Sequence, residues 1–361
     1  MMKKLILFII LAVVIIGFGM FFIFGANQIN KIATMTFEDM LSYTTKNNED
    51  AIITVGVIKD GVPNYSVYGK NRVLLPNEKH IYEIGSITKT ITASLLFKAI
   101  EEGKINMEDC IDKYLDLPKK EYYPIIKQIL THTSGYKDFY LESQMVSNFF
   151  NRRNDFYGIS KEQLINRIGK INLKNRIYTF NYSNFGISII GAILSEIYKE
   201  DYAKIIEIYL KEELELKNTV ISNGLGDLGN YWEWLENDAY LPAGGLTSNI
   251  EDMLKYARLQ LDEMPEYLSI MHNKFIEINA TSGKNASMNI RFDSIGATWI
   301  IDTNNNIIWH NGGTSNYNSY IGFDLKKQIA VIILSNLPPN YRIPATVMGV
   351  KLLIELQSEP D

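Results

Sequence analysis

Hydrophobic and polar residues alternate along both ends of the chain, whereas the middle follows a helical period. Apolar runs at 51–58 and 62–69 flank the short turn "KDG", and this pattern predicts a β-hairpin. Near the C-terminus, "ATWIID" and "NIIWH" flank "TNNN", and "YIGFD" and "QIAVIILSN" flank "LKK". These runs predict two further hairpins.

Helical spacing dominates between the strands. An amphipathic helix is predicted in "MTFEDMLSYTTKNNED", and the segment from Ile87 to Ile100 is apolar nearly all round, which is typical of a buried helix that Gly103 ends. Residues 105–235 are predicted to be mostly helical, although 138–175 fits no element well. Two more helices are predicted over 249–262 and 342–357.

The economical arrangement of these elements is an α/β (α+β) fold with one antiparallel sheet built from both chain ends and flanked by helices. We predict an α/β lobe of residues 34–104 and 243–361, with a mostly helical lobe of residues 105–242 inserted between them. A cleft between two such lobes is a natural ligand site.

The N-terminus carries a further prediction. "MMKK" precedes 20 residues without a charge, 5–24, which is enough for a transmembrane helix. The lysines favour an inside N-terminus. A signal-peptidase site requires small residues, but the large Ile23 or Phe24 would occupy its outer position. An uncleaved anchor over 1–25 is therefore favoured over a cleaved signal. We predict a linker at 26–33 and a single-pass membrane protein whose catalytic domain, 34–361, is extracytoplasmic.

Composition restricts the function classes. The chain of 361 residues is 46% hydrophobic and 21% charged, as in a globular protein, and its net charge of −5 argues against a nucleic-acid partner. The single cysteine, Cys110, excludes an internal disulfide and a cysteine-rich metal site, and we expect an inert thiol in a packed helix. His80, His132 and His272 lack metal-ligand spacing, so no metal or other cofactor is expected.

Three clusters carry candidate chemistry. Ser86 and Lys89 in "YEIGSITKT" lie one helical turn apart, as a nucleophile and its base would, although this spacing is common by chance and Ser86 could be a helix N-cap. Tyr182 and Asn184 precede a long helix in "FNYSNFG". His310 ends a strand in "IIWHNGGTSNY", where a surface histidine and a tight turn are the alternatives.

Taken together and in this order, the motifs resemble the serine β-lactamase and penicillin-binding protein superfamily, in its class C and D-Ala-D-Ala carboxypeptidase-like branch. The resemblance covers about residues 50–336 and extends to "IKQILTHTSGY" and "LPAGGLTSNIEDMLKYA". It implies a β-lactamase/transpeptidase-like fold and an acyl-enzyme on Ser86. Residues 131–133, a recurring stretch of the family, are interpreted as structural.

The resemblance also implies roles for the motif residues. Lys89 would be the base, and Tyr182 would pass a proton to the leaving group, its phenolate stabilised by Lys89 and His310. Asn184 would donate to the substrate amide and to Lys89. The backbone N–H groups of Ser86 and Gly313 would form the oxyanion hole. The remaining substrate-binding positions are Gly312 and Thr314.

One departure narrows the expected activity. Dedicated class C β-lactamases have lysine where this chain has His310, and histidine there resembles the carboxypeptidases, esterases and D-amino-acid peptidases of the branch. We therefore expect a serine hydrolase of D-alanyl peptides or esters in peptidoglycan or teichoic-acid-like polymers. A β-lactamase and a non-catalytic sensor are the alternatives. Neutral His310 is expected to partner Tyr182, so that activity falls on the acid side.

Overall fold

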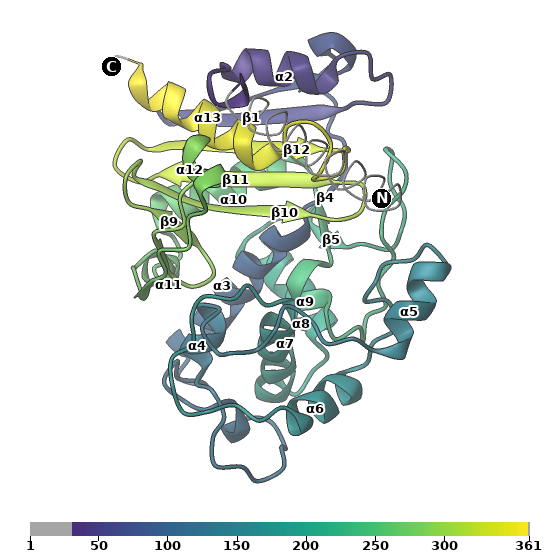
Figure 1. The fold of residues 1–361 in the computed structure, drawn as a ribbon, viewed down its shortest axis with the longest axis vertical. Coiled ribbons are helices and arrows are strands. Elements are labelled where there is room, and N and C mark those ends of the chain that lie inside the picture. Colours follow the sequence, from purple (N-terminus) through teal and green to yellow (C-terminus); the bar gives the residue numbers. More distant parts are fainter. Residues whose placement is uncertain (1–30, 360–361) are drawn as a thin grey trace, which may run out of the picture.

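The main sheet joins both ends of the chain. A computed structural model describes residues 31–359, and their main sheet has nine antiparallel strands in the order β3-β2-β1-β12-β11-β10-β9-β8-β7 (Figure 1). Its strands are β1 Ile53–Lys59, β2 Val62–Tyr68, β3 Leu74–Leu75, β7 Ile276–Glu277, β8 Ser294–Ile295, β9 Ile300–Asp302, β10 Ile307–Gly313, β11 Asn318–Asp324 and β12 Ile329–Ser335.

The predicted antiparallel sheet is confirmed by the register of its central strands. β1 pairs with β12, the last strand of the chain, with Val55 opposite Ile333. The predicted hairpins are β1–β2, β9–β10 and β11–β12. A second, three-stranded sheet consists of β4 Tyr82–Glu83, β6 Leu246–Ser248 and β5 Val220–Ile221. Because β4 lies just before Ser86, this small sheet anchors the predicted nucleophile.

Helices cover both faces of the main sheet and gather in the lobe below it. The helices are α2 Phe37–Thr45, α3 Thr88–Glu101, α4 Ile126–Leu130, α5 Ser143–Phe150, α6 Lys161–Lys170, α7 Asn184–Tyr198, α8 Tyr202–Ile208, α9 Leu241–Gly244, α10 Ile250–Asp262, α11 Tyr267–Met271, α12 Gly283–Ser287 and α13 Ala345–Ser358. Figure 1 shows α2 and α13 over one face, α10 behind the sheet, and α4 to α8 grouped below it.

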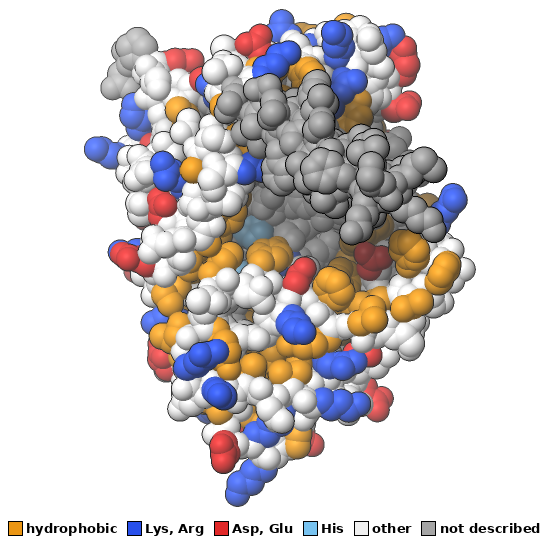
Figure 2. All heavy atoms as spheres, viewed as in Figure 1, with side chains coloured by type: hydrophobic (Ala, Val, Ile, Leu, Met, Phe, Trp, Pro, Cys, Tyr) orange, Lys and Arg blue, Asp and Glu red, His pale blue; other side chains and the backbone are white. Residues whose placement is uncertain are grey.

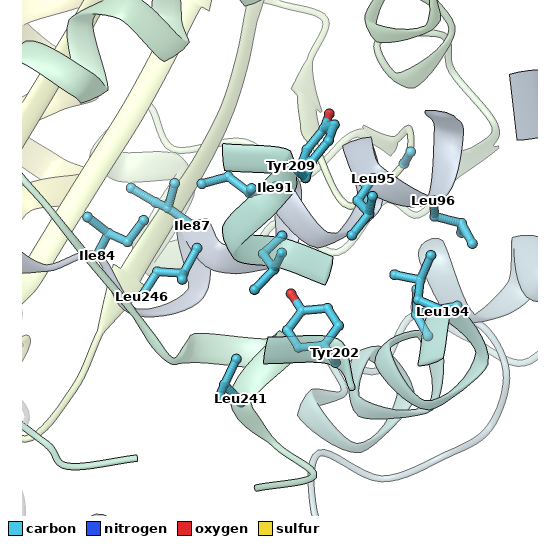
Figure 3. Packing of buried hydrophobic residues seen from close by; sticks show 14 of the residues in the cluster. Ile84, Ile87, Ile91, Leu95, Leu96, Leu194, Tyr202, Tyr209, Leu241 and Leu246 are labelled. Atoms are coloured by element: carbon cyan, nitrogen blue, oxygen red, sulfur yellow. The ribbon is translucent and has the colours of Figure 1, made fainter. Parts of the chain in front are cut away.

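Helix α3 is the central element of the core, as its all-round apolar pattern predicts. Ile87, Ile91 and Leu95 are fully or almost fully buried against residues of the sheet lobe and of the helices below it. Figure 3 shows Tyr202 and Tyr209 pointing at this helix. Each such aliphatic side chain contributes about 1.5–3 kcal/mol by its burial. The start of α3, where Ser86 and Lys89 lie, therefore has a rigid support.

One local prediction is wrong, and one alternative that the sequence left open is excluded. The segment around Cys110 is not a helix, because Cys110 forms an isolated bridge with Ile125 and only Ile111–Lys113 makes a short 3-10 turn. The helix N-cap of α3 is Ile87, not Ser86, and it has no side-chain capping bond. Pairing with a distant segment overrides the helical spacing in the first case. The unassigned stretch 138–175 contains α5 and α6.

The predicted anchor, 1–25, lies outside the described residues, as does most of the predicted linker. Residues 31–33, which the linker prediction includes, are helical. Among residues 31–359, no helix is both long and apolar enough to cross a membrane.

Candidate active site

Ser86 lies where strand β10 touches the start of α3. It belongs to the 3-10 turn Gly85–Ile87, which leads directly into α3. A Cβ atom at Gly85 would lie 2.6 Å from the Gly313 backbone nitrogen, and one at Gly312 would lie 1.9 Å from the Ile84 carbonyl oxygen. Only glycine permits this approach. The glycines of "GS" and "HNGG" therefore bring the backbone of β10 next to the Ser86 turn.

Lys89 is fully buried beside Ser86. Its Nζ lies 2.8 Å from Ser86 Oγ and donates to the Ala243 carbonyl oxygen at 2.5 Å. Burial lowers the pKa of Lys89 to about 7, and the Asp138 carboxylate opposes this by favouring the charged form. A large fraction of the amine is therefore neutral at neutral pH. Because one N–H is held by Ala243, the lone pair of the neutral amine can accept the Ser86 proton.

Tyr182 is positioned by the "THTSG" segment. The Asn181 N–H donates to the His132 carbonyl at 2.8 Å, and the Ser183 N–H donates to His132 Nδ1 at 3.2 Å. The His132 ring lies against Tyr182, with 4.7 Å between ring centroids. Residues 131–133 thus have the structural role predicted for them. They hold Tyr182 so that Lys89 Nζ lies 4.9 Å from its ring centroid.

The Tyr182 phenol stays protonated in this site. Burial raises its pKa above the ordinary value, the hydrogen bond with Ser86 lowers it by less, and Asp138 raises it further. This pKa describes the free site, and the phenolate that the resemblance implies during proton transfer stays a prediction. The phenol can still pass a proton, because it can donate its own proton as it accepts one.

Asn184, the first residue of α7, makes a different contact from the expected one. Its amide nitrogen donates to Asp138 Oδ1 at 2.8 Å, and its backbone N–H donates to the same oxygen at 3.1 Å. The predicted donation to Lys89 is absent from the hydrogen bonds of the described residues. Asp138 instead fixes the Asn184 side chain at the edge of the cavity beside Ser86, which Asn184 lines.

His310 is a neutral residue in the interior of the site. Its Nδ1 lies 2.7 Å from the Asn311 carbonyl oxygen, which can only accept, so Nδ1 carries the proton and Nε2 carries the lone pair. The centroids of the His310 and Tyr182 rings are 6.4 Å apart. Burial first, and then the Lys89 charge, lower the pKa of His310 to about 3. The neutral form expected from the sequence is thus favoured.

The fall of activity at acid pH, which the sequence analysis attributes to protonation of His310, should come from another group. With its pKa near 3, His310 keeps one protonation state across the range in which the protein is assayed. We expect the His310→Gln variant to lose activity overall but to keep its acid limb near pH 7. The measurement is the pH dependence of kcat/KM for a neutral ester. Disappearance of the limb in this variant would assign it to His310 after all.

The Ser86 cavity is the space beside the nucleophile. It is lined by Ser86, Phe156, Asn184, Trp232, Trp234, Tyr240, Ala243, Gly244, Gly313 and Thr314. Figure 2 shows hydrophobic side chains gathered over the helical lobe on the viewed face. The structure thus brings Ser86, Asn184, Gly313 and Thr314 to one cavity, with Lys89 buried next to Ser86.

Glu83 is a site residue that the sequence did not indicate. Glu83 is only 3% exposed, and its carboxyl group accepts hydrogen bonds from the Thr314 hydroxyl and the Trp232 backbone N–H. Burial raises its pKa to about 7, and these two hydrogen bonds oppose the shift. The only sequence signal was a carboxylate three residues before Ser86. Among residues 31–359, no group of three or more potential ligands could hold a metal ion.

Comparisons with known proteins agree with this fold. The sequence model of the Beta-lactamase family matches residues 50–346. Protein flp of Staphylococcus aureus (strain MW2) is 24% identical over 287 residues, which cover 72% of this chain and 53% of that protein. The chain thus spans about half the length of the curated relatives it matches first.

Solved structures share the fold, and two of them are similar over most of this chain. A beta-lactamase/D-alanine carboxypeptidase from Yersinia pestis has a TM-score of 0.69 at 17% identity, covering 92% of this chain and 99% of that one. The octameric penicillin-binding protein homologue from Pyrococcus abyssi has a TM-score of 0.69 at 21% identity, covering 85% and 74%. Since the family match spans most of the chain, this protein belongs to the Beta-lactamase family, whose members are serine hydrolases.

Proposed function

We propose that this protein is a serine acyl hydrolase that acts through an acyl-enzyme on Ser86. The observation that carries the proposal is the buried Lys89 amine 2.8 Å from Ser86 Oγ, with its pKa lowered to about 7. A serine hydroxyl needs an adjacent base to become a nucleophile. A lysine that is largely neutral at neutral pH, and whose other contact is a backbone carbonyl, supplies that base.

In the acylation step, Ser86 Oγ attacks the substrate carbonyl carbon while its proton moves to Lys89 Nζ. The negative charge that develops on the carbonyl oxygen is stabilised by the backbone N–H groups of Ser86 and Gly313. Tyr182 then gives its proton to the leaving group and recovers one from Lys89. The ring of neutral His310 lies 6.4 Å from the Tyr182 ring, centroid to centroid, and adds no second positive charge beside Lys89.

In the deacylation step, water replaces the leaving group. The same groups act in reverse: the water loses its proton toward Tyr182 and Lys89, attacks the ester carbonyl, and Ser86 Oγ recovers a proton as the acyl group departs. Asn184, held by Asp138 at the cavity edge, is positioned to bind the acyl part of the substrate. No metal or cofactor takes part in these steps.

We propose D-alanyl peptides or esters of the bacterial cell envelope as substrates, in peptidoglycan or teichoic-acid-like polymers. His310 supports this choice, because dedicated class C β-lactamases have lysine at the position it resembles. The printed name of the Yersinia pestis neighbour, which includes D-alanine carboxypeptidase, supports it as well. A β-lactamase, whose name the same neighbour also carries, and a sensor that deacylates too slowly to turn over are the alternatives.

The test is intact-mass analysis of the protein with a fluorescent penicillin, followed over hours. For a penicillin-binding hydrolase we expect an adduct on Ser86 that persists for much longer than one turnover of an ester. Rapid loss of the adduct would identify a β-lactamase instead. A stable adduct without hydrolysis of any D-alanyl ester or peptide would favour the sensor, and ester hydrolysis without an adduct would point to a dedicated esterase.

The proposed location is the outer face of the cell membrane, with residues 1–25 as an uncleaved anchor. The uncharged stretch 5–24 after "MMKK" supports it. The short linker would keep the active site near the membrane and favour membrane-proximal substrates. Cell fractionation and N-terminal sequencing test this proposal. Mature protein in the medium with a new N-terminus after Ala26 would contradict it.

A further inference from the structure

Helix α5 presents hydrophobic side chains to solvent on the face that is normally polar. Its buried residues are Met145 and Asn148. Val146, Phe149 and Phe150, in contrast, are 46%, 72% and 77% exposed. Positions three and four apart share one face of a helix, so these three side chains lie together. The Phe149 and Phe150 rings are in contact, with centroids 5.7 Å apart. We call Val146, Phe149 and Phe150 the α5 face.

The α5 face belongs to a longer apolar stretch. Leu141, two residues before α5, is also 67% exposed. Figure 2 shows hydrophobic side chains gathered where Figure 1 places α5, at the right of the view. The solvent side of a surface helix is normally polar, and exposed apolar surface that is contiguous marks an interaction site. The α5 face therefore indicates an apolar partner.

Two arginines follow the α5 face directly. Arg152 and Arg153 are exposed, and neither forms an ion pair within the described part of the chain. The only acidic residue among 139–154 is Glu142, which is paired with Arg167 at 2.7 Å. Exposed rings beside unpaired arginines fit the surface of a bilayer with anionic lipids. The rings can enter the acyl boundary while the guanidinium groups stay among the headgroups.

A small anion bound inside the protein fits these arginines less well. Arg152 and Arg153 line a cavity of about 620 Å³ beside the α5 face, but Asp155 and Glu233 line it too. An anion inside this cavity would meet two carboxylates as well as the two guanidinium groups, so its charge would be poorly compensated. The arginines therefore favour an extended anionic surface outside the cavity.

The α5 face borders the same end of β10 as the start of the described chain. Phe149 lines the cavity of the preceding paragraph together with Asn316, which lies in the turn from β10 to β11. Ile32 lines a separate hollow with Asn311, near the end of β10, and with Pro339. The proposed anchor precedes Ile32 by only a few residues of sequence. An anchored domain would therefore meet the bilayer at the end where the α5 face lies.

We propose that the α5 face and the two arginines after it dock the catalytic domain on a bilayer that contains anionic lipid. Docking goes beyond the proposed function, because the contact is made by the domain itself and no step of acyl transfer depends on it. The Ser86 cavity and the cavity beside the α5 face share Trp232. Docking would therefore open the active site close to the lipid headgroups.

The first experiment measures whether α5 enters the bilayer. The full chain is reconstituted in vesicles of phosphatidylcholine and phosphatidylglycerol. Ser147→Cys, in a Cys110→Ser background, places a fluorescent NBD label on an exposed position of α5 and retains both phenylalanines. We expect lipids with a doxyl group near the headgroup to quench this label at least about twofold, because the α5 face lies at the acyl boundary.

The matched control label is at Val62→Cys. Val62 is a hydrophobic residue that is 64% exposed. It pairs with Lys59 at the end of the sheet that carries the β11–β12 turn, away from the β10–β11 turn. Its label should stay in water and should not be quenched. Equal quenching of the two labels overturns docking through α5.

The outcomes also separate docking from the proposed anchor. A chain that remains bound to vesicles while its Ser147→Cys label is not quenched overturns docking and leaves the anchor in place. A chain that does not bind vesicles contradicts both. If the α5 face instead packs against a second copy, the label is again not quenched, and the chain in detergent is a dimer that Phe149→Ser/Phe150→Ser makes monomeric. That result overturns docking as well.

A double variant tests the phenylalanines. Phe149→Ser/Phe150→Ser should fold, since both rings are exposed, and should lose the quenching at Ser147→Cys while the chain stays bound to vesicles. The matched control is Val73→Ser/Leu74→Ser, which removes another adjacent pair that is 56% and 64% exposed. This control should keep the quenching. Quenching that persists in a folded Phe149→Ser/Phe150→Ser variant overturns the role of the α5 face.

A second double variant tests the arginines. Quenching of the label on α5 should increase with the fraction of phosphatidylglycerol in the vesicles, because arginines near the surface are attracted to anionic headgroups. Arg152→Gln/Arg153→Gln should lose this dependence and keep the quenching that the rings provide. High salt should weaken the dependence in the unmodified sequence. The same dependence in the glutamine variant overturns the role of the two arginines.

Discussion

Ser86→Ala should abolish covalent acylation by a labelled penicillin or an ester substrate and leave the fold intact. The variant loses the only atom that forms the acyl bond in the proposed mechanism, so acylation falls by several orders of magnitude. The substitution removes a hydroxyl at a half-exposed position, and Lys89 keeps its hydrogen bond to the Ala243 carbonyl. The free energy of unfolding should therefore change by no more than about 1.5 kcal/mol.

Intact-mass analysis measures the acylation of Ser86→Ala, and thermal unfolding followed by circular dichroism measures its stability. The control is Ser287→Ala, an exposed serine on α12 whose hydroxyl bonds only a carbonyl of its own helix. This control should acylate at the wild-type rate. Persistent labelling of Ser86→Ala at the wild-type rate would remove Ser86 from the mechanism, whatever the behaviour of Lys89.

The architecture of the sheet was open to prediction because its signals are local. Strand alternation around short turns identified β1–β2, β9–β10 and β11–β12, and an all-round apolar run identified the buried helix α3. The joining of both chain ends in one sheet followed from the order of the elements. Local spacing failed where a distant partner decided the structure, as at Cys110, whose bridge to Ile125 replaces the expected helix.

In the candidate site, too, contacts within one motif could be predicted, whereas contacts between distant segments could not. Ser86 and Lys89 are three residues apart, so a local motif could indicate their contact. The contacts that shape the rest of the site join distant parts of the chain: Glu83 meets Trp232 and Thr314, and Ala243 meets Lys89. Nothing in a single sequence reports such pairs, because each residue type is ordinary in its own segment.

The pKa values were open to prediction in direction but not in size. A histidine beside a lysine was expected to be neutral, and His310 is. Lys89 is fully buried because α3, α7 and α9 pack around it. This burial lowers the pKa of Lys89 by more than the Asp138 carboxylate raises it. The acid limb that the sequence assigned to His310 is therefore reassigned to Lys89.

Lys89→Ala should lower the acylation rate by several orders of magnitude, because the proposed base is removed. Lys89→Met should have the same effect, and it keeps most of the side-chain volume in a position that is fully buried. Lys98→Ala, on the same helix but in a surface ion pair with Glu213, is the matched control and should retain activity. Near-normal acylation in a folded Lys89→Met variant would show that Lys89 has only a structural role.

The pH dependence of the wild type supplies the second test of Lys89. The proton acceptor is the neutral amine, and burial lowers its pKa to about 7, so protonation below that pH removes the base. We expect kcat/KM for a neutral ester to rise with pH through about 7 and then to level off. The raised pKa of Tyr182 keeps its phenol protonated across the same range. Residual activity of Lys89→Met should lack the limb, whereas His310→Gln should keep it. If activity still falls below pH 7 in Lys89→Met, the fall belongs to another titrating group. Glu83, whose pKa is also raised to about 7, would be tested first with the Glu83→Gln variant.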